Sequence, residues 1–250
     1  MTCKGRTTMH TRPTIRELEA HRDLHASAGA GLAEVILGGQ DGLVNVLGVI
    51  LGVAAASADQ RIILAAGLAA TFAESVSMAA GVYTSQRAAQ DYYRGQLERE
   101  KEHIRRFAAI EREEIRRIYA GKGFDGDLLE TVVDRITADE ETWIEEMMTQ
   151  EFNLSPVEQG QPLRLGLIVG VAAIAGSLIP LTPFVFLPVA QAVVGSLVVA
   201  GLTLFAVGFY KARATQVGDW RRSGLEMAII GLASALIGYL VGWLFRVPAA

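Results

Sequence analysis

Residues 95–119, GQLEREKEHIRRFAAIEREEIRRIY, sort their charges by helix face. At 3.6 residues per turn, four side chains suited to binding a metal fall within an arc of roughly 80°. These side chains are Glu100, His103, Glu111 and Glu114. The arginines lie on the other side, three or four residues from Glu102 and Glu113, with which they can pair. Glu102 and Glu113 can therefore pair with arginines, whereas Glu100, Glu111 and Glu114 have no such partner on their face of the helix.

The unpartnered carboxylates share their side of the helix with apolar residues, namely Ile104, Phe107, Ile115 and Ile118. A carboxylate on such a face is costly to desolvate unless it is protonated, paired or bound to a cation. Several such groups beside a histidine favour a cation. The alternative is an amphipathic helix whose boundary glutamates reach round to water.

The composition indicates a membrane protein. Of the 250 residues, 51% are hydrophobic and 26 are glycine, and the mean hydropathy of +0.30 is too high for an average soluble domain. The net charge of −4 hides a segregation, because 18 of the 27 acidic residues lie between Asp91 and Glu158. The single cysteine, Cys3, excludes a disulfide framework and a cysteine metal site. A polar domain is therefore inserted between hydrophobic halves.

Five apolar segments are long enough to cross a bilayer as helices at about 1.5 Å per residue. The predicted spans are residues 33–56, 62–83, 163–179, 184–210 and 225–245. The second is expected to continue as a helix to Gly121, and Pro180 and Pro183 predict a tight turn between the third and fourth. Residues 1–14 are expected to be disordered, with no signal peptide evident.

The insert is expected to form three helices, the first of which contains residues 95–119. The second, residues 128–137, has an apolar stripe of Leu128, Leu129, Val132, Val133 and Ile136. The third, residues 139–152, places Trp143, Met147 and Glu151 on one face, with Glu140 and Met148 at its edges. The unpaired carboxylates would then meet Met147, Met148 and Glu151.

Polar residues inside the first two spans are candidate functional residues, because ionisable groups are rare and costly in a bilayer. Asp41 and Asn45 lie one turn apart, and Glu34 precedes Asp41 by two turns. Glu74 lies in the second span, with Met78 one turn later, and a carboxylate with a thioether suits a transition metal better than magnesium or calcium. The alternatives are a headgroup-level position for Asp41 and Glu34 and simple packing for Met78.

The basic residues predict the orientation of the chain. Of the 23 lysines and arginines, 21 lie in the N-terminal segment, the insert or the loop between the fourth and fifth spans. The positive-inside rule therefore places these three parts in the cytosol and the C-terminus on the other side. His21 and His25 have the i,i+4 spacing of metal ligands, although two histidines without a third ligand are usually surface residues.

Three segments resemble the vacuolar iron transporter family, of the VIT or CCC type. They are QDGLVNVLGVILGVAAA (40–56), AESVSMAAGVYTSQ (73–86) and LFAVGFYKAR (204–213). The resemblance extends from about Glu34 to Phe245 and includes the position of the acidic insert. It implies an all-α homodimer of five-span protomers that exports ferrous iron from the cytosol in exchange for protons.

The resemblance also implies a domain organisation. Residues 1–32 would be a cytosolic segment, 33–90 spans one and two, 91–160 a cytosolic metal-binding domain, and 161–250 spans three to five. It assigns translocation to Asp41 and Met78, with Glu74 as a companion. It further implies metal ligands in the insert, namely Glu100, Glu111, Glu114, Met147, Met148 and Glu151. His103 stands where the family is expected to have a glutamate, which leaves the number of bound metals and their selectivity open.

We expect Fe²⁺ as the substrate, with Mn²⁺, Co²⁺ and Zn²⁺ as alternatives, and no cofactor, enzyme activity or nucleic-acid partner. The cell (inner) membrane is the expected location, and a vacuolar membrane is the alternative. Glu100 and His103 have the Glu-x-x-His spacing of di-iron bundles, so a membrane-anchored ferroxidase or peroxidase is a rival reading. The sequence has no second Glu-x-x-His. A metal-sensing or structural membrane protein is the third possibility.

Overall fold

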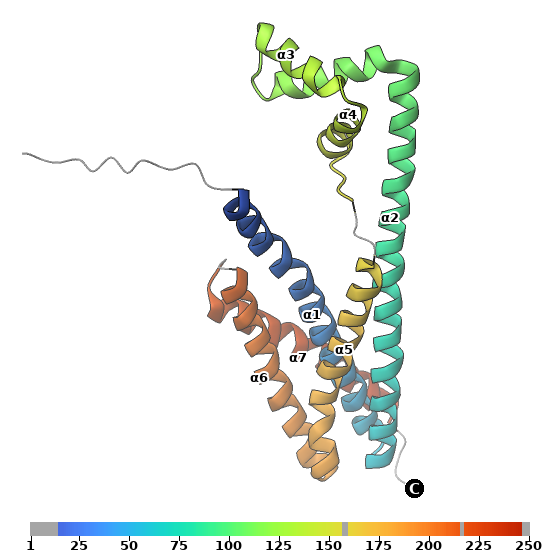
Figure 1. Ribbon diagram of the computed structural model, residues 1–250. Coiled ribbons are helices and arrows are strands. Elements are labelled where there is room, and N and C mark those ends of the chain that lie inside the picture. The colour runs from blue at the N-terminus through green and yellow to red at the C-terminus, as the bar shows by residue number, and fades with distance from the viewer. Residues whose placement is uncertain (1–14, 157–159, 216–217, 247–250) are drawn as a thin grey trace, which may run out of the picture. The chain divides into compact units, whose positions relative to one another are not determined.

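The computed structural model describes residues 15–156, 160–215 and 218–246, with side chains from residue 31 onward. Its elements, shown in Figure 1, are α1 (Ile15–Ala56), α2 (Gln60–Gly121), α3 (Gly126–Thr137), α4 (Glu140–Glu146), the π-helix η1 (Met147–Glu151), α5 (Gln161–Phe186), α6 (Val189–Thr215) and α7 (Trp220–Leu244). The described residues contain no β-strand, which agrees with the predicted all-α fold. The predictions for residues 1–14 and for the side chains of His21 and His25 lie outside the described part.

Five helices are long and apolar enough to cross a membrane, as the sequence predicts. They are α1 from Gly31, α2, α5, α6 and α7. Large apolar side chains on them point outward, and Val76, Val171 and Leu202 are 69%, 65% and 66% exposed. Exposed apolar surface on this scale is unfavourable in water but not against lipid.

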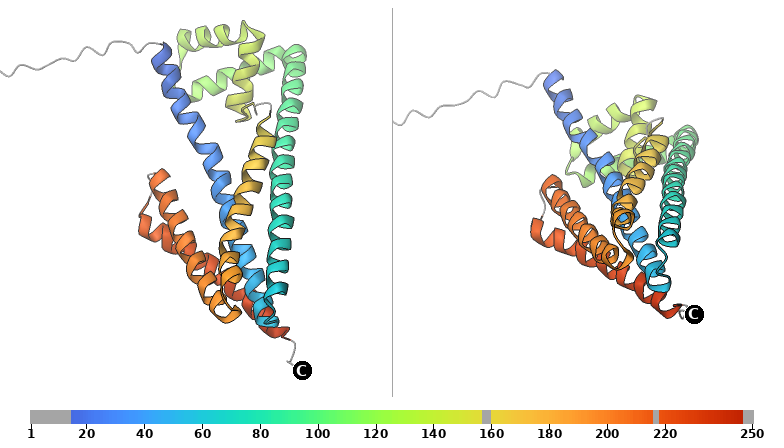
Figure 2. Two further views of the ribbon diagram at one scale, coloured as in Figure 1. Left: turned by 60° about the horizontal axis from the view of Figure 1, so that its bottom comes forward. Right: turned by 90° about the horizontal axis from the view of Figure 1, so that it is seen from below.

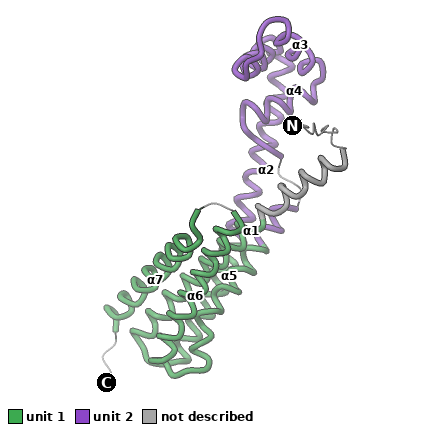
Figure 3. Tube along the Cα trace, turned by 90° about the vertical axis from the view of Figure 1, so that its left-hand side faces the viewer, with its two compact units in different colours: residues 1–79, 167–250 green, residues 80–166 purple. Residues whose placement is uncertain are grey.

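The chain divides into two compact units, residues 1–79 with 167–250, and residues 80–166 (Figure 3). The first unit contains most of the membrane-spanning residues. In it α1 packs against α6 and α7, and α6 packs against α7 (Figure 2). The second unit contains the polar insert, and α2 and α5 each run from one unit into the other.

Glycines let the helices of the first unit approach closely. A Cβ added at Gly242 of α7 would collide with the backbone carbonyl of Gly52 in α1. A Cβ at Gly176 of α5 would collide in the same way with the carbonyl of Gly39. These glycines therefore lie at close helix contacts, as is common in membrane proteins.

The predicted turn at Pro180 and Pro183 is wrong, because α5 continues through both prolines to Phe186. The two prolines remove the backbone donors for the carbonyls of Gly176 and Ile179, a loss that membrane helices tolerate. The hydroxyl of Ser196 in α6 donates to the Pro180 carbonyl at 2.6 Å. The chain turns instead at residues 187–188, directly before α6.

The insert departs from the predicted three helices at two points. The second span continues as α2 to Gly121, as predicted, but α2 is interrupted at Phe107 (φ −128°, ψ 32°). The third helix of the insert divides into α4 and the π-helix η1. Val133 and Ile136 are buried as predicted, but Leu128 is 59% exposed and lies outside the core. The buried residues of this core are Ile104, Ile115, Val133, Ile136, Trp143, Ile144, Met147 and Met148.

The close contact at Gly242 generates a stability prediction. Gly242→Ala should destabilise the folded protein by about 1–3 kcal/mol, because the methyl group must displace the backbone of α1. The measurement is the melting temperature of the purified protein in detergent. Gly95→Ala is the control, since no atom lies within 4 Å of its added Cβ and alanine favours a helix over glycine. Equal melting temperatures for the two variants would contradict the predicted contact.

Candidate functional site

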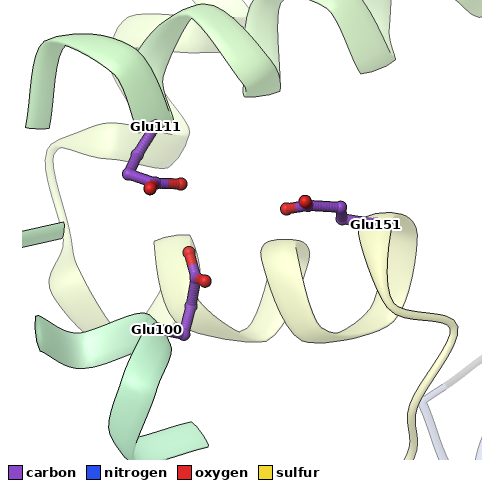
Figure 4. A group of neighbouring side chains, drawn as sticks. All are labelled: Glu100, Glu111 and Glu151. Atoms are coloured by element: carbon purple, nitrogen blue, oxygen red, sulfur yellow. The ribbon is translucent and has the colours of Figure 1, made fainter. Parts of the chain in front are cut away.

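The interruption of α2 at Phe107 brings together two glutamates that a straight helix would separate. Glu100 and Glu111 are eleven residues apart, which corresponds to about 16 Å along a regular helix. In the structure, carboxylate oxygens of Glu100, Glu111 and Glu151 all lie within 4.8 Å of one another. Figure 4 shows the three side chains pointing toward a common space, from the two parts of α2 and from η1. A straight helix, as the sequence pattern implied, would not have allowed this arrangement.

The cluster is largely removed from water. Glu100 and Glu111 are only 2% and 5% exposed, whereas Glu151 is exposed. Oε1 of Glu100 is buried and has no hydrogen-bond partner. Met147 and Met148 are 0% and 1% exposed and belong to the apolar core of the same unit. The site thus combines buried carboxylates with access from the side of Glu151.

Burial and mutual repulsion make these carboxylates hard to ionise. Burial, together with the charges of Glu151 and Glu114, raises the pKa of Glu100 from 4.5 to about 7. Burial and the charge of Glu100 likewise raise the pKa of Glu111 to about 7. Burial and the charge of Glu114 raise the pKa of Glu151. A divalent cation would reverse both causes by supplying opposite charge and direct ligation.

His103 and Glu114 complete the polar surroundings of the cluster. Nδ1 of His103 lies 3.5 Å from Oε1 of Glu111, and a charged imidazole there opposes the rise in the pKa of Glu111. Glu114 acts on the other three carboxylates through its charge. The structure therefore brings Glu100, Glu111 and Glu151 together, with His103 beside Glu111, and it places Met147 and Met148 in the core of the same unit.

The arginines are kept apart from this cluster, as the helical pattern predicts. Arg106 pairs with Glu102, and Arg116 and Arg117 pair with Glu113 at 3.6 and 3.8 Å. Further arginine pairs connect α2 to α3, with Arg112 bound to Asp134 and Arg116 bound to Glu130.

This unit contains a further buried polar contact, between Tyr119 and Glu146, that the sequence pattern does not predict. The pKa of Tyr119 is raised by burial and by the neighbouring carboxylate of Glu146. Oε2 of Glu146 is buried without a hydrogen-bond partner. Nothing in the helical spacing of Glu146 separates it from the exposed Glu145, so the sequence carried no signal for its burial.

A second group of candidate residues lies in the first unit. Asp41 and Asn45 line a groove of about 750 Å³ between α1 and α7, together with Gly48 and Gly238. Glu74 of α2 does not line this groove, but Asp41 and Asn45 are its polar neighbours. Both carboxylate oxygens of Glu74 are buried without a hydrogen-bond partner.

The other two residues predicted for the membrane path, Met78 and Glu34, do not line the groove. Met78 is half-buried one turn after Glu74 and does not line the groove. Glu34 has one buried carboxylate oxygen without a partner and also lies outside the groove lining. The structure thus associates Asp41, Asn45 and Glu74 with one another.

Residues 32–243 match the model of the VIT family. The chain belongs to the VIT family. The relatives of this family member include "Vacuolar iron transporter 1" of Eucalyptus grandis, which is 32% identical over 222 residues, covering 88% of this chain and 89% of the relative. "Vacuolar iron transporter 1" of Arabidopsis thaliana is 31% identical over 220 residues, covering 87% and 88%. "Vacuolar iron transporter" of Toxoplasma gondii is 26% identical over 249 residues, covering 95% and 82%.

These relatives confirm the family that the three sequence segments indicated. They are named as transporters and not as enzymes. Together with the five apolar helices, the comparison identifies this VIT family member as a multi-pass membrane protein.

The raised pKa values predict how the stability of the metal-free protein depends on pH. Because the pKa values of Glu100 and Glu111 in the folded state are about 7 and the ordinary value is 4.5, the folded state binds more protons than the unfolded state between these values. The melting temperature should therefore fall by a few degrees as the pH rises from about 4.5 through 7. Hydrogen exchange of α3 and α4 would assign the effect to this unit.

Glu100→Gln should reduce this pH dependence, since glutamine cannot ionise. Glu113→Gln is the matched control, because Glu113 lies on the same helix but pairs with arginines. A wild-type melting temperature that rises over this pH range would contradict the assigned pKa values.

Proposed function

We propose that this protein transports ferrous iron out of the cytosol across a membrane in exchange for protons. The observation that carries the proposal is the cluster of Glu100, Glu111 and Glu151, whose carboxylates are within 4.8 Å of one another and poorly able to ionise without a cation. Iron as the substrate is supported by the names of the relatives.

The ligand chemistry of the cluster fits a divalent transition metal. Carboxylates alone would suit magnesium or calcium, whereas an imidazole nitrogen at His103 favours iron, manganese, cobalt or zinc. We infer that Glu114 and the thioethers of Met147 and Met148 are further ligands. Metal competition for the same site would rank iron against manganese, cobalt and zinc.

For passage through the membrane we propose Asp41, Glu74 and Met78, assisted by Asn45 and Glu34. The buried Glu74 carboxylate, with no hydrogen-bond partner and with Asp41 and Asn45 as neighbours, supports this path. Carboxylates in the bilayer are costly when charged and empty, so they should take up protons as the metal leaves. Competition between metal and protons for the same oxygens would produce the antiport.

We further propose that the protein is a homodimer with its N-terminus and insert in the cytosol. The distribution of 21 of 23 basic residues supports this orientation. A cell membrane is the proposed location, although the relatives are named as vacuolar.

The insert site is tested by metal binding to the purified protein under anaerobic conditions. Glu100→Gln and Glu111→Gln should each weaken Fe²⁺ binding at least about tenfold, because each removes a charged ligand from a buried site. Calorimetry at pH 7.5 would measure the change, with Glu113→Gln as the control. Unchanged affinity in the first two variants would contradict the site.

The membrane path is tested by Fe²⁺ uptake into proteoliposomes that contain a pH-sensitive dye. Asp41→Asn and Met78→Leu should abolish uptake and the coupled proton movement, while the metal affinity of the insert stays unchanged. Full uptake in either variant would remove that residue from the path. Oxygen consumption on adding Fe²⁺ would instead support the ferroxidase.

A further inference from the structure

A second polar pocket lies in the unit formed by residues 80–166, apart from the carboxylate cluster. Its volume is about 470 Å³. One wall is formed by Tyr83, Arg87, Gln90 and Arg94 of α2, and the other by the first turn of α5. The four α2 residues follow at intervals of four, three and four, so they form one stripe along the helix.

The two arginines of this stripe differ from those farther along α2. Arg112 and Arg116 are bound to carboxylates of α3. Among the residues that the structure describes, Arg87 and Arg94 have no carboxylate partner, and the recorded bond of Arg87 is a donation to the Gln90 side-chain oxygen at 3.4 Å. Two positive charges thus line the cavity, and none of the described residues that form its wall is acidic.

The start of α5 strengthens the preference for an anion. Gly160, with φ of 89°, directly precedes the helix, and Pro162 lies in its first turn. The N-terminus of a helix carries a partial positive charge that attracts phosphate. The residues at the start of α5 and the two arginines line the same pocket.

The position of the pocket along the chain points to a lipid as the source of the anion. Tyr83 ends the apolar part of α2, and Leu163 begins the apolar part of α5. Both residues flank the insert, so they lie at the ends of their spans on the same side of the membrane. At these ends the two helices would pass from the hydrocarbon into the headgroup layer. Tyr83 and Leu163 are 41% and 58% exposed, and aromatic and basic side chains are typical of the headgroup level.

We propose that this pocket binds the phosphate of an anionic phospholipid headgroup through Arg87 and Arg94. The apolar surface of Leu163 would contact the upper part of an acyl chain, which a free phosphate lacks. Basic pockets between membrane helices on the cytosolic side are suited to anionic headgroups. The proposal is independent of iron transport, since none of the carboxylate-cluster residues lines the pocket.

The test counts lipids retained by the purified full-length protein in native mass spectrometry, after exchange into micelles containing phosphatidylglycerol and phosphatidylcholine. The wild type should retain phosphatidylglycerol preferentially. The double variant Arg87→Gln/Arg94→Gln should lose this preference by roughly 25-fold, because each arginine near an anionic lipid contributes about a fivefold factor.

The matched control is Arg99→Gln/Arg117→Gln, which removes two exposed arginines of α2 outside the pocket. Equal melting temperatures of both double variants in phosphatidylcholine would show that folding is intact. Equal retention of phosphatidylglycerol in the two double variants would overturn the proposal. Displacement of the lipid by millimolar inorganic phosphate would also overturn it, because the pocket would then prefer a free anion.

Discussion

The insert is built around one constraint: its fold holds the carboxylates of Glu100 and Glu111 close together and shields them from water. Each carboxylate is nearly fully buried, and burial together with the charges of neighbouring carboxylates raises the pKa of both. A fold that served stability alone would replace or pair such groups, because an unpaired buried charge is destabilising. Arg106, Arg116 and Arg117 of the same helix nevertheless pair with other carboxylates. The arrangement is therefore best explained as a site prepared for a cation.

Phe107 is the residue at which this proximity is created. Its non-helical backbone separates two regular parts of α2, and η1 brings Glu151 to the same place from the other end of the insert. π-helical turns occur frequently at functional sites. The apolar core of Ile104, Ile115 and Met147 holds these elements together, so the geometry of the carboxylates depends on ordinary hydrophobic packing.

Much of this could be predicted from sequence, because it rests on periodicity and composition. The five apolar helices follow from segment length, and the separation of arginines from Glu100 and Glu111 follows from helical spacing. The bend at Phe107 could not be read from propensity, since no glycine or proline marks it. A straight helix would hold Glu100 and Glu111 about 16 Å apart, so their convergence was not predicted from the helical pattern.

Other departures arose from tertiary contacts that local sequence does not show. Pro180 and Pro183 resemble a turn signal, yet α5 continues through both, and the hydroxyl of Ser196 on α6 donates to the Pro180 carbonyl. Leu128 belongs to an apolar stripe, yet it lies beyond the edge of the core that buries Val133.

The central claim is that a cation binds to carboxylates whose pKa values are raised. Its most direct test is the number of protons released when Fe²⁺ binds. This number is obtained by anaerobic calorimetry near pH 6.5 in buffers of different ionisation enthalpy. The account predicts release of about one proton or more at pH 6.5, decreasing toward pH 8, because Glu100 and Glu111 are partly protonated near pH 7. It also predicts a smaller release in Glu100→Gln/Glu111→Gln. Binding without proton release, or with the same release in that double variant, would contradict it.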